Sequence, residues 1–398
     1  MQISSIQISN HEFRHRITVL LEYIIEKEYT GAVLFDNNYI LYYTGFAFFP
    51  TERPIAFALN SRGETSLLVP RLELEHAQSN ALTDRVVHYL EYPYDTHPMI
   101  ALKALMADMG ISPPYGADHD GYLQIYGYRG PSLSELLGKP PHQVSFFIEE
   151  QMMIKSPEEQ ALIRESVKWG NLAHTLLQRY TRAGLTENEV SLRASNEATL
   201  RMMDAIGPIY KSLNPYSDGA GAGYRGQIGR GAAIPHSLAN NIVFQPGDIL
   251  VTGAGAPVWG YNSELERTMV LGKPNEAQIR MFGHMLALQE TAFELLKPGR
   301  QCCDIDHAVT DYYKKHNLVD YWKHHTGHSI GLREHESPFL DLGDKTEIKP
   351  GMVFTVEPGL YIPNLGGFRH SDTVLITKDG NEILTYYPRD LESLTIPE

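Results

Sequence analysis

The chain has 398 residues, of which 42% are hydrophobic and 21% are charged, and its formal net charge is -14. This length exceeds one ordinary domain and this balance excludes a disordered or fibrous protein, so we expect two globular domains with a large buried core. The acidic charge, with no basic run to override it, argues against nucleic acid and against a membrane surface as partners.

The N-terminus and the cysteines favour a cytoplasmic protein. Residues 1–16 are polar and lack the basic and apolar regions of a signal peptide, and no apolar stretch is long enough to span a bilayer. The two cysteines, Cys302 and Cys303, are adjacent, which fits neither a disulfide framework nor zinc-ligand spacing. Such cysteine use is typical of a reducing compartment.

The first part of the chain is predicted to be a small α/β domain. Residues 29–41, 53–59 and 64–68 are rich in β-branched and aromatic residues and predict strands, whereas residues 97–109 have helical spacing. We place this domain at residues 1–152, because a strong helix start follows directly.

That helix start is a capping box. Ser156 can cap the helix while Glu159, three residues later, bonds back to the backbone of the cap. Gly184 stands where a left-handed C-terminal cap belongs. Thr186 and Glu189 repeat the capping box for a second helix.

Two later segments share one design. Residues 245–255 and 349–359 each place a Pro-Gly turn before an apolar strand, and second strands follow at 268–271 and 373–377. The pattern indicates a weak internal duplication within a second domain at residues 153–398, whose halves would face each other across a cleft. The simpler interpretation is that Pro-Gly turns before strands are common and that the two segments are not related.

Ordered motifs of the second domain closely resemble the pita-bread family of creatinase, prolidase, aminopeptidase P and methionine aminopeptidase. The motifs are Ile234-Pro235-His236, Pro246-Gly247-Asp248, Gly260-Tyr261 with Glu264 to Thr268, Thr326-Gly327-His328, His335-Glu336-Ser337-Pro338, Val356-Glu357-Pro358-Gly359 and Gly367-Phe368-Arg369. The resemblance implies an α/β (α+β) fold, with a small N-terminal creatinase/prolidase-type domain followed by a C-terminal pita-bread catalytic domain.

The resemblance also implies where metal ligands would lie. Metallopeptidases of the family hold two ions with five ligands, which fall here on Gly253, Glu264, His328, Glu357 and Ser371. Glycine cannot ligate and serine replaces a bridging carboxylate poorly, so we expect no cofactor. If a metal is bound, we expect one divalent ion such as Mn or Zn on Glu264, His328 and Glu357.

Creatinase, which hydrolyses its substrate without a metal, supplies the remaining expectations. His236 falls on its catalytic acid/base histidine, and Glu266 and Glu357 fall on its two substrate-binding carboxylates. His328 lies in a Gly-His-Ser string that is also similar to creatinase, so the resemblance implies a catalytic group of His236, Glu266, His328 and Glu357. A metal-free hydrolase needs a side chain that exchanges protons near neutral pH, and histidine does this most readily.

Further residues are assigned to substrate binding on the same resemblance. They are Tyr261, Glu264, His335 and Arg53, the last reaching across a homodimer to the substrate carboxylate. Arginine suits that role because its planar fork pairs with both oxygens of a carboxylate.

Three functions remain open at this point. The main expectation is a metal-independent, creatinase-like hydrolase that cleaves a carbon–nitrogen bond in a small, carboxylate-bearing substrate. The first alternative is a metal-dependent Xaa-Pro dipeptidase or aminopeptidase. The second is a pita-bread binding module that has lost catalysis, which the retained polar residues disfavour.

Overall fold

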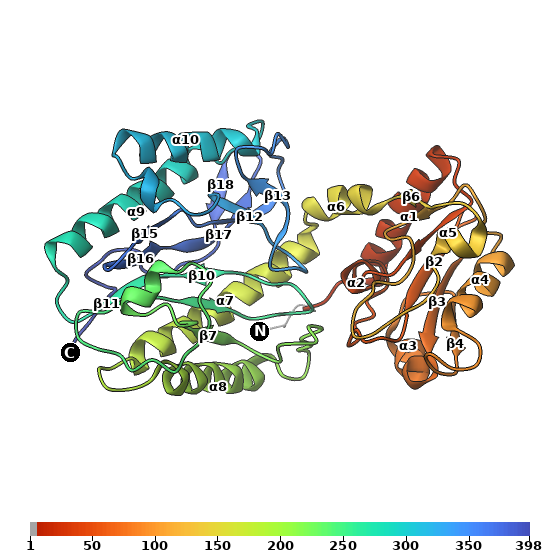
Figure 1. Cartoon of the computed structure of the whole chain (residues 1–398), viewed down its shortest axis with the longest axis horizontal. Coiled ribbons are helices and arrows are strands. Elements are labelled where there is room, and N and C mark those ends of the chain that lie inside the picture. The colour runs from red at the N-terminus through yellow and green to blue at the C-terminus, as the bar shows by residue number, and fades with distance from the viewer. Residues whose placement is uncertain (1–5) are drawn as a thin grey trace. The chain divides into compact units, whose positions relative to one another are not determined.

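The computed structural model describes residues 6–398, which divide into two compact units. One unit is Ile8–Met152, and the other contains all residues from Met153 to Glu398 (Figure 1). Both units mix helices with sheets, so the α/β class predicted from the sequence is confirmed. None of the described helices is both long and apolar enough to cross a membrane.

The unit Ile8–Met152 is built on a six-stranded sheet with the order β4-β3-β2-β1-β5-β6. The central pairs β1–β2 and β2–β3 are antiparallel, and the outer pairs are parallel. The elements are α1 (Asn10–Glu26), β1 (Gly31–Leu34), α2 (Asn37–Thr44), β2 (Ala56–Asn60), β3 (Thr65–Pro70), η1 (Arg71–Glu73), α3 (Leu74–Asn80), β4 (Arg85–Tyr89), α4 (Pro98–Asp108), β5 (Gly116–Ala117), α5 (Leu133–Leu137) and β6 (His142–Gln143), with α6 (Ser145–Met153) leading to the other unit.

One predicted strand of this unit is partly wrong. Residues 31–34 form β1 as expected, but α2 begins at Asn37. Asp36 caps this helix by accepting hydrogen bonds from the backbone N–H groups of Asn38 and Tyr39 at 2.8 and 3.1 Å. A good N-cap thus outweighs the strand propensity of the aromatic residues that follow.

The larger unit places strands between two pairs of helices (Figure 1). Its main sheet has the order β13-β12-β14-β17-β10-β9-β7, with β18 paired to β17, and smaller sheets have the orders β19-β11-β8 and β15-β16. The helices are α7 (Pro157–Tyr180), α8 (Glu187–Ile206), α9 (Glu276–Leu295) and α10 (Cys302–Lys315), with 3₁₀ turns η2 (Gly229–Ala233) and η3 (Val319–Tyr321). The strands are β7 (Gly221–Gly223), β8 (Ile249–Val251), β9 (Gly253–Gly255), β10 (Leu265–Glu266), β11 (Thr268–Leu271), β12 (Gly327–Ser329), β13 (Glu336–Leu340), β14 (Val353–Val356), β15 (Gly359–Ile362), β16 (Gly366–Arg369), β17 (Ser371–Ile376), β18 (Asn381–Ile383) and β19 (Thr395–Ile396).

The predicted start of α7 is confirmed. The Ser156 side chain accepts from the Glu159 N–H, and the Glu159 carboxylate accepts from the Ser156 N–H at 2.8 Å. The predicted end is wrong, since α7 stops at Tyr180 and Gly184, although left-handed, lies beyond the cap. Apolar residues along one face of α7 pack it against β7 and β9, so the helix supports the strands that lead to the site.

A histidine is buried where α7 meets this sheet. The Nε2 atom of His174 lies 2.7 Å from Thr252 Oγ1, and its ring packs edge-on against Tyr387. Burial, assisted by the charge of Arg267, lowers the pKa of His174 to about 3. The imidazole therefore stays neutral while the chain is folded.

We predict that His174 makes the larger unit acid-sensitive. As pH falls, His174 takes up a proton in the unfolded chain at its ordinary pKa of 6.5, but in the folded chain only near 3. The free energy of unfolding therefore decreases as pH falls from 6.5 towards 3. One such group contributes a slope of up to ~1.4 kcal/mol per pH unit. His174→Gln should flatten the dependence of unfolding on pH.

The measurement is denaturant unfolding between pH 7 and pH 5, in the presence of a chelator. Tryptophan fluorescence reports on this unit, because all three tryptophans, Trp169, Trp259 and Trp322, lie in it. His307→Gln on the exposed face of α10 is the matched control and should keep the wild-type slope. Equal slopes for all three proteins would contradict the prediction.

Candidate functional site

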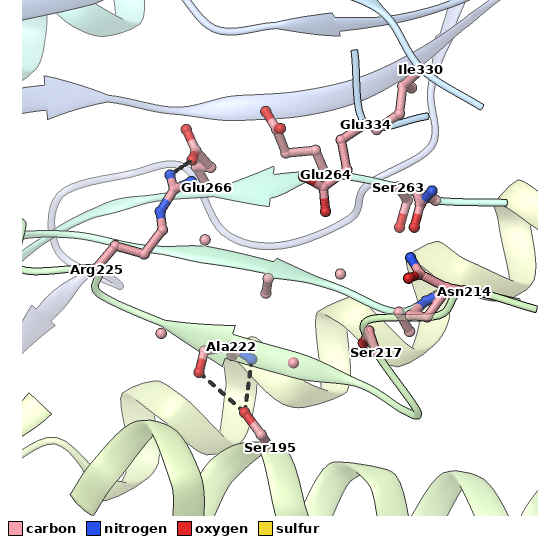
Figure 2. A pocket seen from close by; sticks show the side chains of 18 residues that line it. Ser195, Asn214, Ser217, Ala222, Arg225, Ser263, Glu264, Glu266, Ile330 and Glu334 are labelled. Carbon is pink, nitrogen blue, oxygen red and sulfur yellow. Dashed lines mark hydrogen bonds and ion pairs between the residues drawn. The ribbon is translucent and has the colours of Figure 1, made fainter. Parts of the chain in front are cut away.

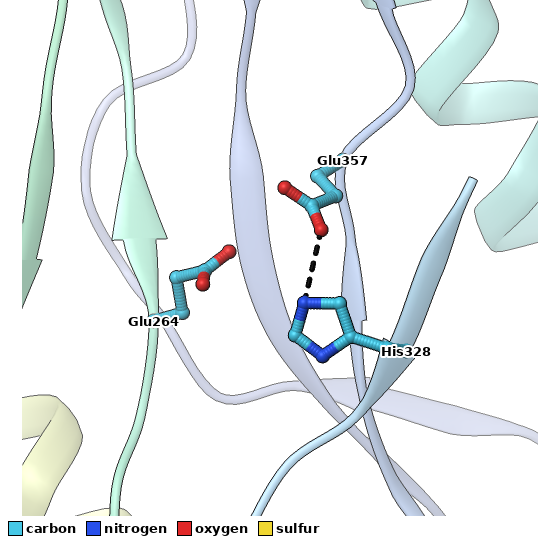
Figure 3. Close-up of side chains that lie close together, drawn as sticks. All are labelled: Glu264, His328 and Glu357. Carbon is cyan, nitrogen blue, oxygen red and sulfur yellow. Dashed lines mark ion pairs between the residues drawn. The ribbon is translucent and has the colours of Figure 1, made fainter. Parts of the chain in front are cut away.

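Three side chains from separate strands converge in the larger unit (Figure 3). Glu264 directly precedes β10, His328 lies in β12, and Glu357 directly follows β14. One donor atom from each lies within 4.8 Å of the other two, and His328 and Glu357 are buried. Among the described residues, this is the group of acidic and histidine side chains with the geometry to hold a metal ion.

The sheet order explains how these residues meet. β14 and β17 lie between β12 and β10, so the strand ends bring residues about 90 positions apart to one place. Side chains alternate along a strand, so Glu264 and Glu266 share a face while Leu265 is buried on the other. Ser371 pairs with Glu266 across the strands, and its hydroxyl donates to Glu264 Oε1 at 2.6 Å.

His328 is oriented as a ligand. Its Nδ1 atom lies 3.0 Å from the Ser329 carbonyl oxygen, which favours a proton on Nδ1 and leaves Nε2 as the donor atom facing the carboxylates. Nε2 is buried and makes no aligned hydrogen bond, although Glu357 Oε1 lies 3.1 Å away. Nε2 therefore faces the carboxylates of Glu264 and Glu357, and a cation placed among these three groups would satisfy all of them.

The pKa values of the three side chains are shifted in directions that favour positive charge, as a proton or a cation, among the carboxylates. Burial, followed by the charges of Glu357 and Glu266, raises the pKa of Glu264 to about 8. Burial opposes the charge of His328, but Glu357 and Glu264 outweigh it and raise the pKa of His328 to about 9. Burial likewise opposes the charge of Glu357, yet His328 holds the pKa of that carboxyl well below its usual range. A metal ion that bound these three side chains would have to displace protons from Glu264 and His328.

Glu266 belongs to a different charge group. Its carboxylate accepts from Arg369 through both oxygens, with Arg369 Nη2 at 2.7 Å, and from Arg225 Nη2 at 2.7 Å. Arg369 also donates to the Tyr361 hydroxyl at 3.0 Å. Glu266, expected from the sequence to bind the substrate, is thus already paired with two guanidinium groups.

Two further histidines border the cluster. The His335 ring stacks on the His328 ring with centroids 3.7 Å apart. Burial, followed by the charge of His328, lowers the pKa of His335 to about 4, and His236 is close enough to contribute. The exposed His236 follows η2 in the chain. His335 therefore lies directly against His328, with His236 near enough to affect its pKa.

Two other predicted residues have different surroundings. Tyr261 is buried and its hydroxyl donates to Glu159 Oε1 in α7 at 2.8 Å. Arg53 lies in the smaller unit, where its guanidinium bonds the carboxylates of Glu91 and Glu52, each at 2.6 Å. Neither residue is joined to the cluster by these contacts.

Sequence reasoning assigned no role to the two arginines that hold Glu266. Arg369 belongs to the Gly367-Phe368-Arg369 motif, so the sequence does contain a signal for a functional arginine at this position. Arg225 follows a glycine-rich stretch and is brought to Glu266 only by the turn after β7, a contact 41 residues apart in the chain.

Known proteins share both parts of this architecture. Residues 161–378 match metallopeptidase family M24, and residues 16–112 match the creatinase/prolidase N-terminal domain. An Xaa-Pro dipeptidase of Pyrococcus horikoshii is 29% identical over 380 residues, which cover 94% of this chain and 98% of that protein. The two-part fold expected from the resemblance is confirmed.

Solved structures agree with this assignment. The prolidase from Pyrococcus horikoshii OT3 superposes with a TM-score of 0.79 at 25% identity, covering 95% of this chain and 99% of that one. The Xaa-Pro dipeptidase from Bacillus anthracis gives a TM-score of 0.78 at 25% identity, with the same coverage of 95% and 99%.

These relatives correct two expectations. The main expectation of a metal-independent, creatinase-like hydrolase is wrong, because the matching family is one of metallopeptidases and the relatives are Xaa-Pro dipeptidases. The expectation of no cofactor is wrong for the same reason. Glycine at 253 and serine at 371 do remove donors, but Glu264, His328 and Glu357 still converge, and three protein ligands suffice for one catalytic ion.

The family match covers more than half of the chain, and the donor cluster lies inside the matched residues. The chain therefore belongs to metallopeptidase family M24, and it is a hydrolase of carbon–nitrogen bonds.

Proposed function

We propose that this chain is a metal-dependent dipeptidase that cleaves Xaa-Pro peptide bonds. The observation that carries the proposal is the convergence of Glu264, His328 and Glu357, which offer two carboxylates and one imidazole. Zinc and manganese both accept such a set. A bound ion supplies a Lewis acid that polarises the scissile carbonyl and activates water. The relatives named prolidase and Xaa-Pro dipeptidase support the substrate class.

The surrounding residues hold the ligands in place. The Ser371 hydroxyl fixes one oxygen of Glu264, and the Ser329 carbonyl fixes the ring of His328. Thr355 Oγ1 lies 3.4 Å from Glu357 Oε1 and supports that carboxylate. Such outer contacts restrict the rotamers of the ligands, which is what a preformed metal site requires.

Histidines beside the cluster serve the substrate. Hydrolysis of an Xaa-Pro bond leaves a proline nitrogen that must accept a proton, and we assign that proton to His236. His335 is neutral at physiological pH, given its pKa of about 4, so it offers hydrogen bonds to the peptide rather than positive charge. Stacking on His328 fixes the plane of the His335 ring.

The assembly and the compartment also belong to the proposal. We infer a homodimer in the cytoplasm, with Arg53 reaching the site of the partner subunit. To do so, Arg53 would have to exchange its bonds to Glu52 and Glu91 for a substrate carboxylate. Cys302 and Cys303 are buried free thiols, which agrees with a reducing compartment.

The metal prediction is one equivalent of Mn²⁺ or Zn²⁺ per chain. Glu264→Gln and His328→Ala should each lower the affinity by at least ~100-fold, because each removes a donor. Affinity should also rise with pH from 6 to 9, since the ion displaces protons held with pKa values of about 8 and 9. Calorimetric titration of the chelator-treated protein measures both effects.

The matched control is Glu334→Gln, which removes an exposed carboxylate near the cluster but outside it. This variant should bind the ion as the wild type does. Two tightly bound equivalents, or affinity unchanged by Glu264→Gln and His328→Ala, would contradict the single site.

The activity prediction is release of proline from Xaa-Pro dipeptides. Chelation should abolish turnover and added Mn²⁺ or Zn²⁺ should restore it, because the cluster has no other Lewis acid to polarise the carbonyl. Proline release is measured with Ala-Pro, and Ala-Ala tests the preference for proline. Full turnover in excess chelator would reject the proposed function.

The proton-transfer prediction concerns His236. His236→Ala should lower kcat by about 10² to 10⁴, the usual scale for losing a general acid or base, with little change in metal affinity. His307→Ala, an exposed histidine on α10, is the control and should keep the wild-type kcat. Wild-type turnover by His236→Ala would show that the histidine has no role in the chemistry.

A further inference from the structure

The turn that carries His335 borders both the metal cluster and a cavity. Residues 330–335 join β12 to β13 and are called the β12–β13 turn below. Ile330 and Glu334 of this turn line a cavity of about 390 Å³ beside the cluster (Figure 2). His335 stacks on His328 of the cluster, with ring centroids 3.7 Å apart. The position of the turn therefore affects what a peptide at the cluster would contact.

A buried ion pair lies at the end of this turn. Glu336, the first residue of β13, accepts a hydrogen bond from Lys155 Nζ through Oε2 at 2.8 Å. The Lys155 side chain is 1% exposed and the Glu336 side chain is 5% exposed. The other oxygen of Glu336, Oε1, accepts from the Arg333 N–H at 3.0 Å. One carboxylate thus joins the backbone of the turn to a lysine outside it.

The backbone of Lys155 is fixed by its neighbours. Its N–H donates to the Gly351 carbonyl at 2.9 Å, and its carbonyl accepts from Gln160 Nε2 at 2.8 Å. The next residue, Ser156, is the N-cap of α7. The start of α7 therefore fixes the point from which the lysine holds the turn.

Gly331 leaves the space that the ion pair occupies. A β carbon built at Gly331 would lie 2.8 Å from Glu336 Oε2 and 3.0 Å from Lys155 Cε, which is too close for a packed interior. The φ of Gly331 is not in the left-handed region, so its backbone conformation does not require glycine. The buried pair supplies the physical reason for glycine at this position.

The start of the turn has a separate anchor. The Asn262 N–H donates to the Gly331 carbonyl at 2.8 Å, and Asn262 Nδ2 lies 3.2 Å from the carbonyl oxygens of Gly331 and Leu332. Loss of Lys155 would leave these contacts in place. It would therefore release the end of the turn that carries His335.

The metal ligands also have support that does not involve the ion pair. Lys155 Nζ lies 3.3 Å from Ser329 Oγ, but this hydroxyl also donates to the Val353 carbonyl at 3.0 Å. Ser329 pairs with Phe354 of β14 as well. The Ser329 carbonyl that orients His328 is thus held by the sheet.

Stability alone does not account for a buried pair of this kind. Taking two charges out of water is unfavourable, and two apolar side chains of similar size are often as stable in their place. An apolar side chain at 336 could not accept from the Arg333 N–H. The pair therefore supplies a direction for the turn that apolar packing would not.

We propose that Lys155 positions His335 by orienting Glu336 and, through it, the β12–β13 turn. This role rests on the proposed function, in which His335 offers hydrogen bonds to the peptide. Lys155 is a positioning residue, because its buried side chain acts through the turn and not by contact with the peptide.

The first test separates KM from kcat. Lys155→Met should raise KM for Ala-Pro by about 10-fold, the scale of one lost hydrogen bond, because His335 is no longer aligned. Both kcat and Mn²⁺ affinity should change by less than about 3-fold. Lys168→Met is the matched control, since Lys168 lies on α7 and pairs with Glu165 at the surface. This control should keep the wild-type KM, and an unchanged KM in Lys155→Met would overturn the proposal.

A second variant separates positioning from folding. Lys155→Met leaves the charge of Glu336 buried without its partner, so it should also lower the denaturant midpoint. Lys155→Met/Glu336→Met removes both charges and should recover the midpoint. KM should stay raised, because the turn still lacks the carboxylate that bonds the Arg333 N–H. Recovery of KM together with the midpoint would show that the pair is only structural.

A double-mutant cycle tests whether the effect passes through His335. In a His335→Ala background, Lys155→Met should raise KM no further, because the residue that it positions is already absent. Increases in KM that multiply in the double variant would contradict a role through His335.

A measurement without turnover separates this inference from the proposed function. The ring protons of His335, assigned by their loss in His335→Gln, should show an NMR shift caused by stacking on His328. Lys155→Met/Glu336→Met should move this resonance towards that of an unstacked histidine, and Lys168→Met should not. If no Xaa-Pro dipeptide is cleaved, the proposed function fails, yet this change should still appear. An unchanged His335 resonance in the double variant would overturn the positioning role.

Discussion

One carboxylate, Glu266, determines how charge is distributed in the site. It is 3% exposed and accepts hydrogen bonds from both Arg225 and Arg369. Its negative charge is therefore neutralised by arginines of the protein. The neighbouring carboxylate on the same face, Glu264, has no such cation and instead faces His328 and Glu357. The two glutamates lie two residues apart on one strand edge and have different surroundings. Glu266 is bonded to guanidinium groups, whereas Glu264 belongs to the cluster that could hold a metal ion.

This division is consistent with the proposal that a site with glycine at 253 and serine at 371 still binds one metal ion. The three remaining donors suffice for one ion. Beside them, the Arg225 guanidinium lies within van der Waals distance of the position that a side chain at 253 would take. A guanidinium group of the protein thus lies beside the position where a further carboxylate is missing, and on our proposal it stands next to a site for a single ion.

Much of the fold was predictable because its signals are local. The Ser156 cap and the strand at 268–271 follow from neighbouring residues and are confirmed. The strand expected up to residue 41 was wrong because Asp36 caps a helix there. The absence of metal was wrong because counting lost ligands ignores how the remaining ones converge. Arg225 was missed since its contact with Glu266 depends on the folded turn after β7 and not on local sequence.

The most direct test of the central claim is a crystal structure of the protein soaked in Mn²⁺, with anomalous scattering used to locate the metal. We expect one anomalous peak, coordinated by Glu264, His328 and Glu357, with Arg225 still paired to Glu266. Two peaks, with Arg225 displaced from Glu266 by the second ion, would contradict the account. A map without any peak at these three residues would do so as well.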